Sequence, residues 1–204
     1  MTKKYELVLD DTISLWGWKL FRIRALISFG SVEVGDLGGY IEKEDNLSHD
    51  GNAWVYGNAK VWGNAEVWGN AEVWGNAEVW GNAEVWGNAK VWGNAKVWGN
   101  AKVWGNAEVW GNAKVWGNAE VWGNAEVWGN AEVSELGDII VFKNHWSSGR
   151  HFTYTKSNKM WKVGCFYGTG QELIEKAYRD SEKSGNYYKA YVDFVETLER
   201  LSEE

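Results

Sequence analysis

The chain has 204 residues, a length that suits one repeat body and one small domain. Its formal net charge of −7 and its pI of about 5.1 argue against a nucleic-acid backbone as a partner. A single cysteine, Cys165, excludes an internal disulfide, and no stretch approaches the ~18 apolar residues that a membrane-spanning helix needs.

The first residues predict no signal peptide, because only a brief apolar run precedes Asp10 and Asp11. A lone cysteine also suits a reducing compartment. We therefore expect a cytoplasmic protein without a membrane partner.

Residues 1–50 predict a β-rich cap. Tyr5 to Leu9 has the pattern of a strand, Asp10 and Asp11 that of a turn, and Phe21 to Ala25 that of a second strand. An open solenoid end exposes unpaired backbone and core side chains, so a segment of different composition before the first repeat is what capping requires.

From Gly51 to Ser134 one phrase, Gly-Asn-Ala-x-Val-Trp, occurs fourteen times without a gap, and x is Glu or Lys in thirteen copies. A fixed short period predicts a solenoid, and Gly-Asn in every copy argues against helix. In a strand, Ala and Val share one face while x and Trp share the other. An unpaired charge does not stay in a dry core, so Ala and Val are predicted to point inward and Gly-Asn to form the bends.

Three strands and three bends predict a triangular coil of eighteen residues, so that fourteen copies make a little under five coils. This stacking brings opposite charges together in seven of ten vertical contacts. It also stacks indoles into three outer ladders, which are Trp62, Trp80, Trp98, Trp116, then Trp68, Trp86, Trp104, Trp122, and Trp74, Trp92, Trp110, Trp128.

Residues 135–204 predict a small α+β domain. Three strands are expected, at Asp138–Phe142, His151–Thr155 and Lys159–Phe166. Thr169 and Glu172 form a capping box for a helix that reaches about Ser181. A second helix is expected after Gly185 and Asn186, with an apolar face of Tyr191, Phe194, Val195, Leu198 and Leu201.

The first sixty residues carry a resemblance. The runs Ile23-Arg24-Ala25-Leu26, Gly35-Asp36-Leu37-Gly38-Gly39-Tyr40-Ile41-Glu42 and Asn46-Leu47-Ser48, followed by the first repeats, resemble the opening of the YdcK-like hexapeptide-repeat proteins of bacteria and their prophages. The resemblance implies a left-handed parallel β-helix and a transferase label inherited from the fold, which does not fix a function. The near-perfect, Trp-bearing repeats depart from that family.

A shorter run, Gly164-Cys165-Phe166-Tyr167-Gly168-Thr169, resembles a C-terminal domain of phage and prophage proteins. The predicted fold is therefore mainly β, with an N-terminal β cap (1–50), a left-handed triangular β-helix of fourteen hexapeptide repeats (51–134) and a C-terminal α+β domain (135–204).

Catalytic candidates are few. Resemblance to hexapeptide acyltransferases implies a catalytic His beside acetyl-coenzyme A, yet no repeat contains a His. Of His49, His145 and His151, only His49 lies where the chain enters the first coil. It is the one weak catalytic candidate, and acetyl-coenzyme A is expected only under this enzyme alternative. Metal ligands do not cluster, so no metal is expected.

The Trp ladders support two interpretations. The indoles either stack to stabilise the coils, or form an apolar surface where a partner docks, such as another copy, a sugar or a protein. Bases fit least, because the repeats sum to −3. The sequence thus predicts a non-catalytic scaffold or a binding or self-association module, with an acyltransferase as the alternative and a consensus design as a third possibility.

Overall fold

A computed structural model describes residues 3–202. It divides into two compact units, Met1–Asp138 and Ile139–Glu204, each of which is described by itself. The first unit holds the N-terminal strands and the whole repeat tract, and the second holds a four-stranded sheet with two helices.

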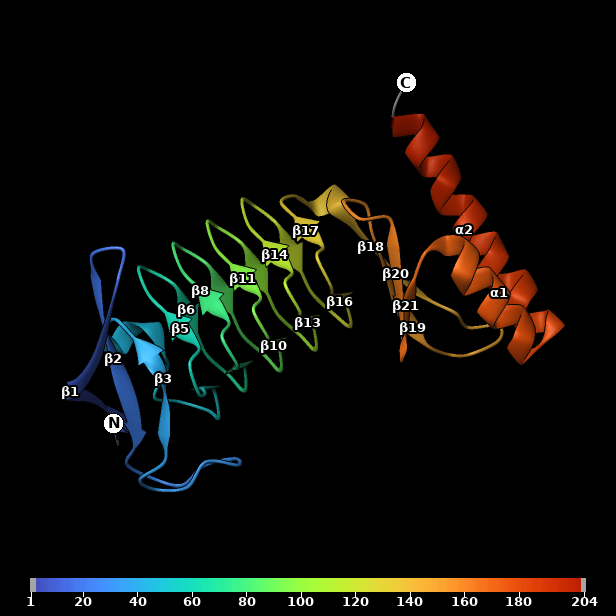
Figure 1. Cartoon of the computed structure of the whole chain (residues 1–204). Coiled ribbons are helices and arrows are strands. Elements are labelled where there is room, and N and C mark those ends of the chain that lie inside the picture. Colours follow the sequence, from blue (N-terminus) through green and yellow to red (C-terminus); the bar gives the residue numbers. More distant parts are fainter. Residues whose placement is uncertain (1–2, 203–204) are drawn as a thin grey trace. The chain divides into compact units, whose positions relative to one another are not determined.

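The repeat tract is a parallel β-solenoid with eighteen residues per coil, as predicted (Figure 1). Three sheets form its sides, because each strand pairs with the strands three copies before and after it; Lys90 lies opposite Glu72 and Glu108. The left-handedness of the coil stays a prediction. The repeat strands are β4 (Trp54–Val55), β5 (Lys60–Val61), β6 (Glu66–Val67), β7 (Glu72–Val73), β8 (Glu78–Val79), β9 (Glu84–Val85), β10 (Lys90–Val91), β11 (Lys96–Val97), β12 (Lys102–Val103), β13 (Glu108–Val109), β14 (Lys114–Val115), β15 (Glu120–Val121), β16 (Glu126–Val127) and β17 (Glu132–Val133).

Methyl-bearing side chains fill the solenoid. Every repeat Ala and Val from Ala53 to Val133 is at most 1% exposed, which confirms the predicted inward face. Between coils, the N–H groups of Asn, x and Trp donate to the carbonyls of Gly, Ala and Val in the next coil, as in Trp74 N to Val91 O at 3.0 Å. Each coil therefore presents its carbonyls to the coil before it.

The corners depend on Gly and Asn together. The fourteen repeat glycines have φ between 59° and 76°, where a side chain is strained, and a Cβ on Gly93 would lie 3.0 Å from the carbonyl oxygen of Gly111. Beside them, the side-chain amides of asparagines eighteen residues apart are joined by hydrogen bonds of 3.0–3.3 Å. These Asn ladders were not predicted, although an Asn in every copy was the available signal.

The N-terminal cap begins with a hairpin of β1 (Tyr5–Leu15) and β2 (Trp18–Ala25). The predicted turn at Asp10 and Asp11 is wrong, since both lie inside β1 at an irregularity between Val8 and Thr12. The chain turns instead at Trp16 and Gly17, both with positive φ, which suits a two-residue hairpin turn. β3 (Leu37–Ile41) then joins β2 to the solenoid by pairing parallel with β5.

Donors from the cap satisfy the carbonyls of the first coil, which no preceding coil can reach. The Lys4 ammonium donates to Ala53 O at 2.8 Å, and the Asn46 side-chain amide donates to Ala65 O at 2.8 Å. Asn46 ends a short 3-10 helix, η1 (Glu44–Asn46). Backbone N–H groups of the cap reach further carbonyls, as in Tyr40 N to Ala59 O at 2.9 Å. The cap thus continues the hydrogen-bond ladder with side chains where strands are missing.

After the last repeat, a short 3-10 helix, η2 (Leu136–Asp138), turns the chain back on the solenoid. The Asp138 carboxylate accepts from the backbone N–H groups of Ser134 (2.7 Å) and Glu135 (3.1 Å). The last coil presents backbone N–H groups, and a side-chain acceptor binds them here. The first coil presents carbonyls, and donors from the cap bind those.

The second unit is an antiparallel sheet, in the order β18 (Ile139–Lys143), β19 (His151–Thr155), β20 (Met160–Val163) and β21 (Phe166–Gly168), with α1 (Gly170–Asp180) and α2 (Glu182–Ser202). The single predicted strand Lys159–Phe166 is two strands, because Gly164 with φ 55° turns the chain. The Thr169–Glu172 capping box is confirmed. α2 starts before Gly185 instead of after it, and Gly185 packs so closely on the Tyr178 ring that an added Cβ would lie 2.2 Å from it.

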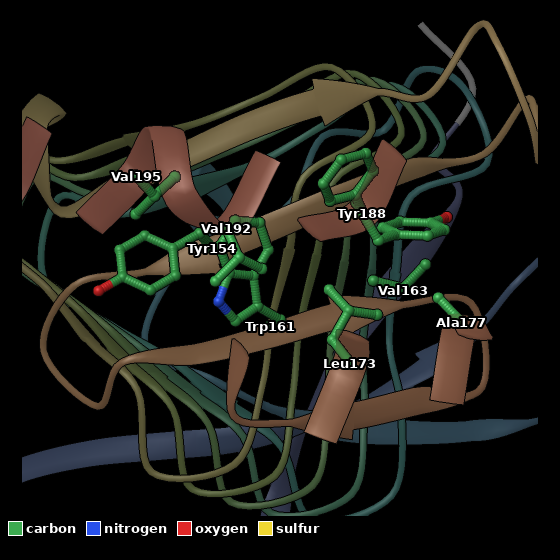
Figure 2. Packing of buried hydrophobic residues seen from close by; sticks show 9 residues of the cluster. Tyr154, Trp161, Val163, Leu173, Ala177, Tyr188, Val192 and Val195 are labelled. Atoms are coloured by element: carbon green, nitrogen blue, oxygen red, sulfur yellow. The ribbon is translucent and has the colours of Figure 1, made fainter. Parts of the chain in front are cut away.

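The core of this unit lies between sheet and helices (Figure 2), and its buried members are Phe152, Tyr154, Trp161, Val163, Leu173, Ala177, Tyr188, Val192 and Val195. The predicted apolar face of α2 is present at helical spacing, but only part of it is buried. Val195 is buried, but Phe194 and Leu201 are 51% and 61% exposed. The reason is that α2 is apolar on two adjacent faces, and Tyr188, Val192 and Val195 occupy the one that meets the sheet.

Candidate functional site

The predicted Trp ladders lie on the solenoid surface. In the first ladder, ring centroids from Trp62 to Trp116 are 4.9–5.1 Å apart and the planes agree within 9°. In the second, from Trp68 to Trp122, the spacing is 4.9–6.0 Å with planes within 12°. In the third, Trp74, Trp92 and Trp110 are tilted by 36–41° from one another. Parallel rings at such distances are in offset stacking.

Stacking covers much of the indole surface. Of the twelve ladder tryptophans, Trp68, Trp74 and Trp122 are exposed, the last at 55%, and eight others are half-buried. An interior ring such as Trp86 has a parallel neighbour on each side, Trp68 and Trp104. The faces of the interior rings are therefore covered by neighbouring rings, and mainly the ring edges are exposed to solvent.

Trp62 is the exception, since it points out of the solenoid yet is only 2% exposed. The N-terminal cap covers it: Trp16 of the hairpin lies edge-on to Trp62 at 6.0 Å, and Leu20 of β2 and Tyr40 of β3 pack in the same cluster as Trp62. Sequence reasoning missed Trp16, because a Trp at a hairpin turn has no periodic signal.

The first repeat departs from the phrase for a related reason. Its x position is Trp54, which is buried between Tyr5 (6.0 Å) and Phe29 (5.3 Å) of the cap. A Lys or Glu there would be a buried charge. The irregular first copy thus marks where the cap sits.

The charged x positions form vertical columns with the predicted neighbours. Opposite-sign neighbours in these columns have N···O distances of 2.8–3.9 Å, such as Lys96 to Glu78 at 3.1 Å. Most of these side chains are partly exposed, so each pair contributes at most ~1 kcal/mol. The charge columns are therefore a modest stabilising feature of the solenoid surface.

His49 belongs to the cap. Its ring stacks on Tyr5 at 4.4 Å, Nδ1 accepts the backbone N–H of Lys4 at 3.2 Å, and Nε2 lies 3.6 Å from Glu44. A neutral ring therefore carries its proton on Nε2, and the lone pair that a general base needs is already engaged. These contacts hold the His49 ring within the cap. The enzyme alternative with acetyl-coenzyme A stays a prediction, which a coenzyme titration would test.

A groove of about 860 Å³ lies beside His49, at the corner where the chain enters the first coil. Asp50, Glu66 and the exposed Trp68 line it. Glu44 lines it too, and its hydrogen bond from the Lys3 ammonium holds the pKa of this carboxyl below its usual range. The groove is acidic with one indole at its wall.

Among residues 3–202, no helix has the length and apolar character of a membrane span, and no group of three or more His, Cys, Asp or Glu side chains is placed to hold a metal ion. In the second unit, Cys165 is exposed at the turn between β20 and β21, and His151 lies on β19. The sequence placed Phe194 and Leu201 on the apolar face of α2, but nothing in the pattern indicated that they are exposed.

Comparison with protein-family models and with curated protein sequences finds no match to this chain. The YdcK-like resemblance and the prophage origin therefore rest on the sequence motifs alone. The fold itself, a β-solenoid of about five coils with parallel sheets, is independent of them.

Proposed function

We propose that the chain is a non-catalytic structural scaffold, in which the Trp ladders lock successive coils into a rigid body. The single observation that carries this is the stacking of each interior indole on its neighbours in the next coils, as in Trp86 between Trp68 and Trp104. A platform for sugars or bases would need open aromatic faces, and interior rings have few. Any partner that meets the ladders would contact ring edges or the exposed Trp68, Trp74 and Trp122.

The test replaces one whole ladder, Trp68, Trp86, Trp104 and Trp122, by Thr. Three stacked pairs are lost, and at ~0.5–1.5 kcal/mol each the solenoid should be destabilised by ~1.5–4.5 kcal/mol. Thermal unfolding followed by circular dichroism measures this, and sedimentation and a glycan array measure association in the same samples.

A structural ladder lowers the melting temperature and leaves sedimentation and glycan binding as in the wild type. A binding ladder does the reverse, since the coil would stay as stable while self-association or ligand capture is lost. Replacing Lys102 and Glu120 by Thr is the matched control, because these partly exposed x positions lie in β12 and β15, the strands that precede Trp104 and Trp122. The cytoplasmic location and the bacterial or prophage setting stay part of the proposal.

A further inference from the structure

Helix α2 has an uncharged side that the described residues cover only in part. From Tyr187 to Leu201, positions at helical spacing carry no charge; they are Tyr187, Ala190, Tyr191, Phe194, Thr197, Leu198 and Leu201, here called the α2 stripe. Phe194 is half exposed and Leu201 more so. The charged residues Lys189, Asp193 and Glu196 lie on another side of the helix. A stripe of this kind, about 21 Å long, is typical of a helix that packs on two neighbours.

The α2 stripe lies on the β18 side of the unit. The Phe142 ring of β18 is 5.3 Å from Tyr191 and 6.4 Å from Phe194, and Tyr191 Oη donates to the carbonyl of Lys143 at 3.2 Å. Helix α1 packs on another side of α2, where Tyr178 meets Gly185. The α2 stripe and strand β18 therefore lie along the same edge of the C-terminal unit.

Strand β18 is an edge strand of that sheet. In the described part of the chain it pairs only with β19. Four of its five residues are apolar, Ile139 to Phe142, and only Lys143 carries a charge. Natural proteins protect an edge strand with charges, proline or a covering segment, because its unpaired N–H and C=O groups accept another strand. β18 has little of this protection.

We propose that two copies of the chain associate at this edge, with β18 pairing antiparallel to β18 and the two α2 stripes packing on each other. Antiparallel pairing around a two-fold axis perpendicular to the sheet keeps both helix layers on one face. A partner must then offer an apolar edge strand with an apolar helix beside it, and a second copy carries both in the required relation. The uncharged stripe lets two chains of charge −7 meet without like charges in contact.

The symmetry fixes the register. Side chains alternate between the two faces of a strand, so opposed residues must point to the same face, and one residue of β18 must lie opposite itself. If the two-fold axis passes at Val141, all five residues of β18 are paired. Ile140 then lies opposite Phe142 on the face of the sheet that the helices cover. This interface involves neither the ladders nor the repeats, so it goes beyond the proposed scaffold and fails or holds independently of it.

Sedimentation of the full chain at tens of micromolar tests the association. The wild type should sediment as a dimer, and Phe194→Asp with Leu201→Asp should raise the dissociation constant at least tenfold. Both side chains are exposed, so the monomer fold is kept, which far-ultraviolet circular dichroism verifies. The matched control is Val34→Asp with Leu37→Asp, two similarly exposed apolar residues of the cap that should leave the dimer intact. A monomeric wild type, or a double variant as dimeric as the wild type, overturns the proposal.

A disulfide tests the register. Opposed Cα atoms in an antiparallel pair lie ~4.5–5.5 Å apart, within the range of a disulfide. In a Cys165→Ser background, Val141→Cys should form a covalent dimer under mild oxidation, whereas Val34→Cys, exposed on the cap, should not. A Val141→Cys chain that stays uncrosslinked while the wild type dimerises rejects β18 pairing about Val141.

Discussion

The solenoid and the C-terminal unit both bury a hydrophobic core, but the solenoid does so with repeated contacts and the C-terminal unit with contacts that all differ. In the solenoid Val91 lies between Val73 and Val109, and the other coils have the same arrangement of Val on Val. In the C-terminal unit each core residue has different neighbours, as Trp161 does in contact with Phe152 and Tyr154. Stability should therefore be a sum of similar increments in the solenoid and one cooperative whole in the unit.

The largest expected effect separates the two regions directly. Trp161→Ala should cost ~3–5 kcal/mol, because the ring is buried at the centre of its core. A unit of this size has a stability of only ~3–10 kcal/mol, so it should be unfolded or nearly so. Trp98→Ala removes two stacked contacts in the solenoid and should cost only ~1–3 kcal/mol.

Calorimetry of both variants resolves this comparison. For Trp161→Ala we expect the transition of the C-terminal unit to disappear while that of the solenoid stays. Equal losses from the two substitutions would show that the ladders are as cooperative as the globular core, and the comparison would then fail.

A glycine corner tests the solenoid rule at a single position. Gly93→Ala should destabilise the solenoid by ~1–3 kcal/mol, since φ is 72° and the new Cβ would press on the Gly111 backbone. Gly137→Ala is the control, because no atom lies within 4 Å of a Cβ there. Urea unfolding of both variants measures the difference, and equal midpoints would contradict the close approach of the corners.

The contrast between repeated and unique contacts also explains which parts of the fold could be predicted from the sequence. The repeat phrase fixed strand, bend and inward face because charge at x and methyls at Ala and Val leave one arrangement. Local signals also placed the Thr169 cap and β19. They failed where two answers satisfy the pattern: Asp10–Asp11 resembles a turn but lies in a strand, and α2 is apolar on two sides. The covering of Trp54 and Trp62 by the cap follows from tertiary contacts that no local pattern records.

Moderately alkaline pH should change the stability of the first unit before it changes that of the C-terminal unit. Burial lowers the pKa of Lys4 to about 8, so between that pH and about 10.5 the unfolded chain binds the proton and the folded one does not. The first unit should therefore become more stable as the pH rises from about 8 to about 10. Burial raises the pKa of Tyr5, and of Tyr154 in the other unit, so both units should lose stability above about pH 10.

Thermal unfolding between pH 7 and 11 follows both trends, with one transition assigned to each unit. Lys4→Met should abolish the gain in unit 1 and leave the C-terminal unit as it was. Lys3→Met, a change at an exposed position, should preserve the gain. A wild type whose first unit loses stability steadily from pH 8 would contradict the buried ammonium.

The smallest effect comes from the charge columns, and it has two signs. Glu66 lies over Glu84, so Glu66→Lys should replace a repulsive contact with an attractive one and stabilise the solenoid by ~0.2–1 kcal/mol. Lys102 lies between Glu84 and Glu120, so Lys102→Glu should make the whole column negative and cost about as much per contact. Unfolding at low salt should show the opposite shifts, and 1 M salt should reduce both because these side chains are partly exposed. Shifts of equal sign would mean that x is chosen for strand propensity and solubility, in which case the order of Lys and Glu along the repeats carries no structural information.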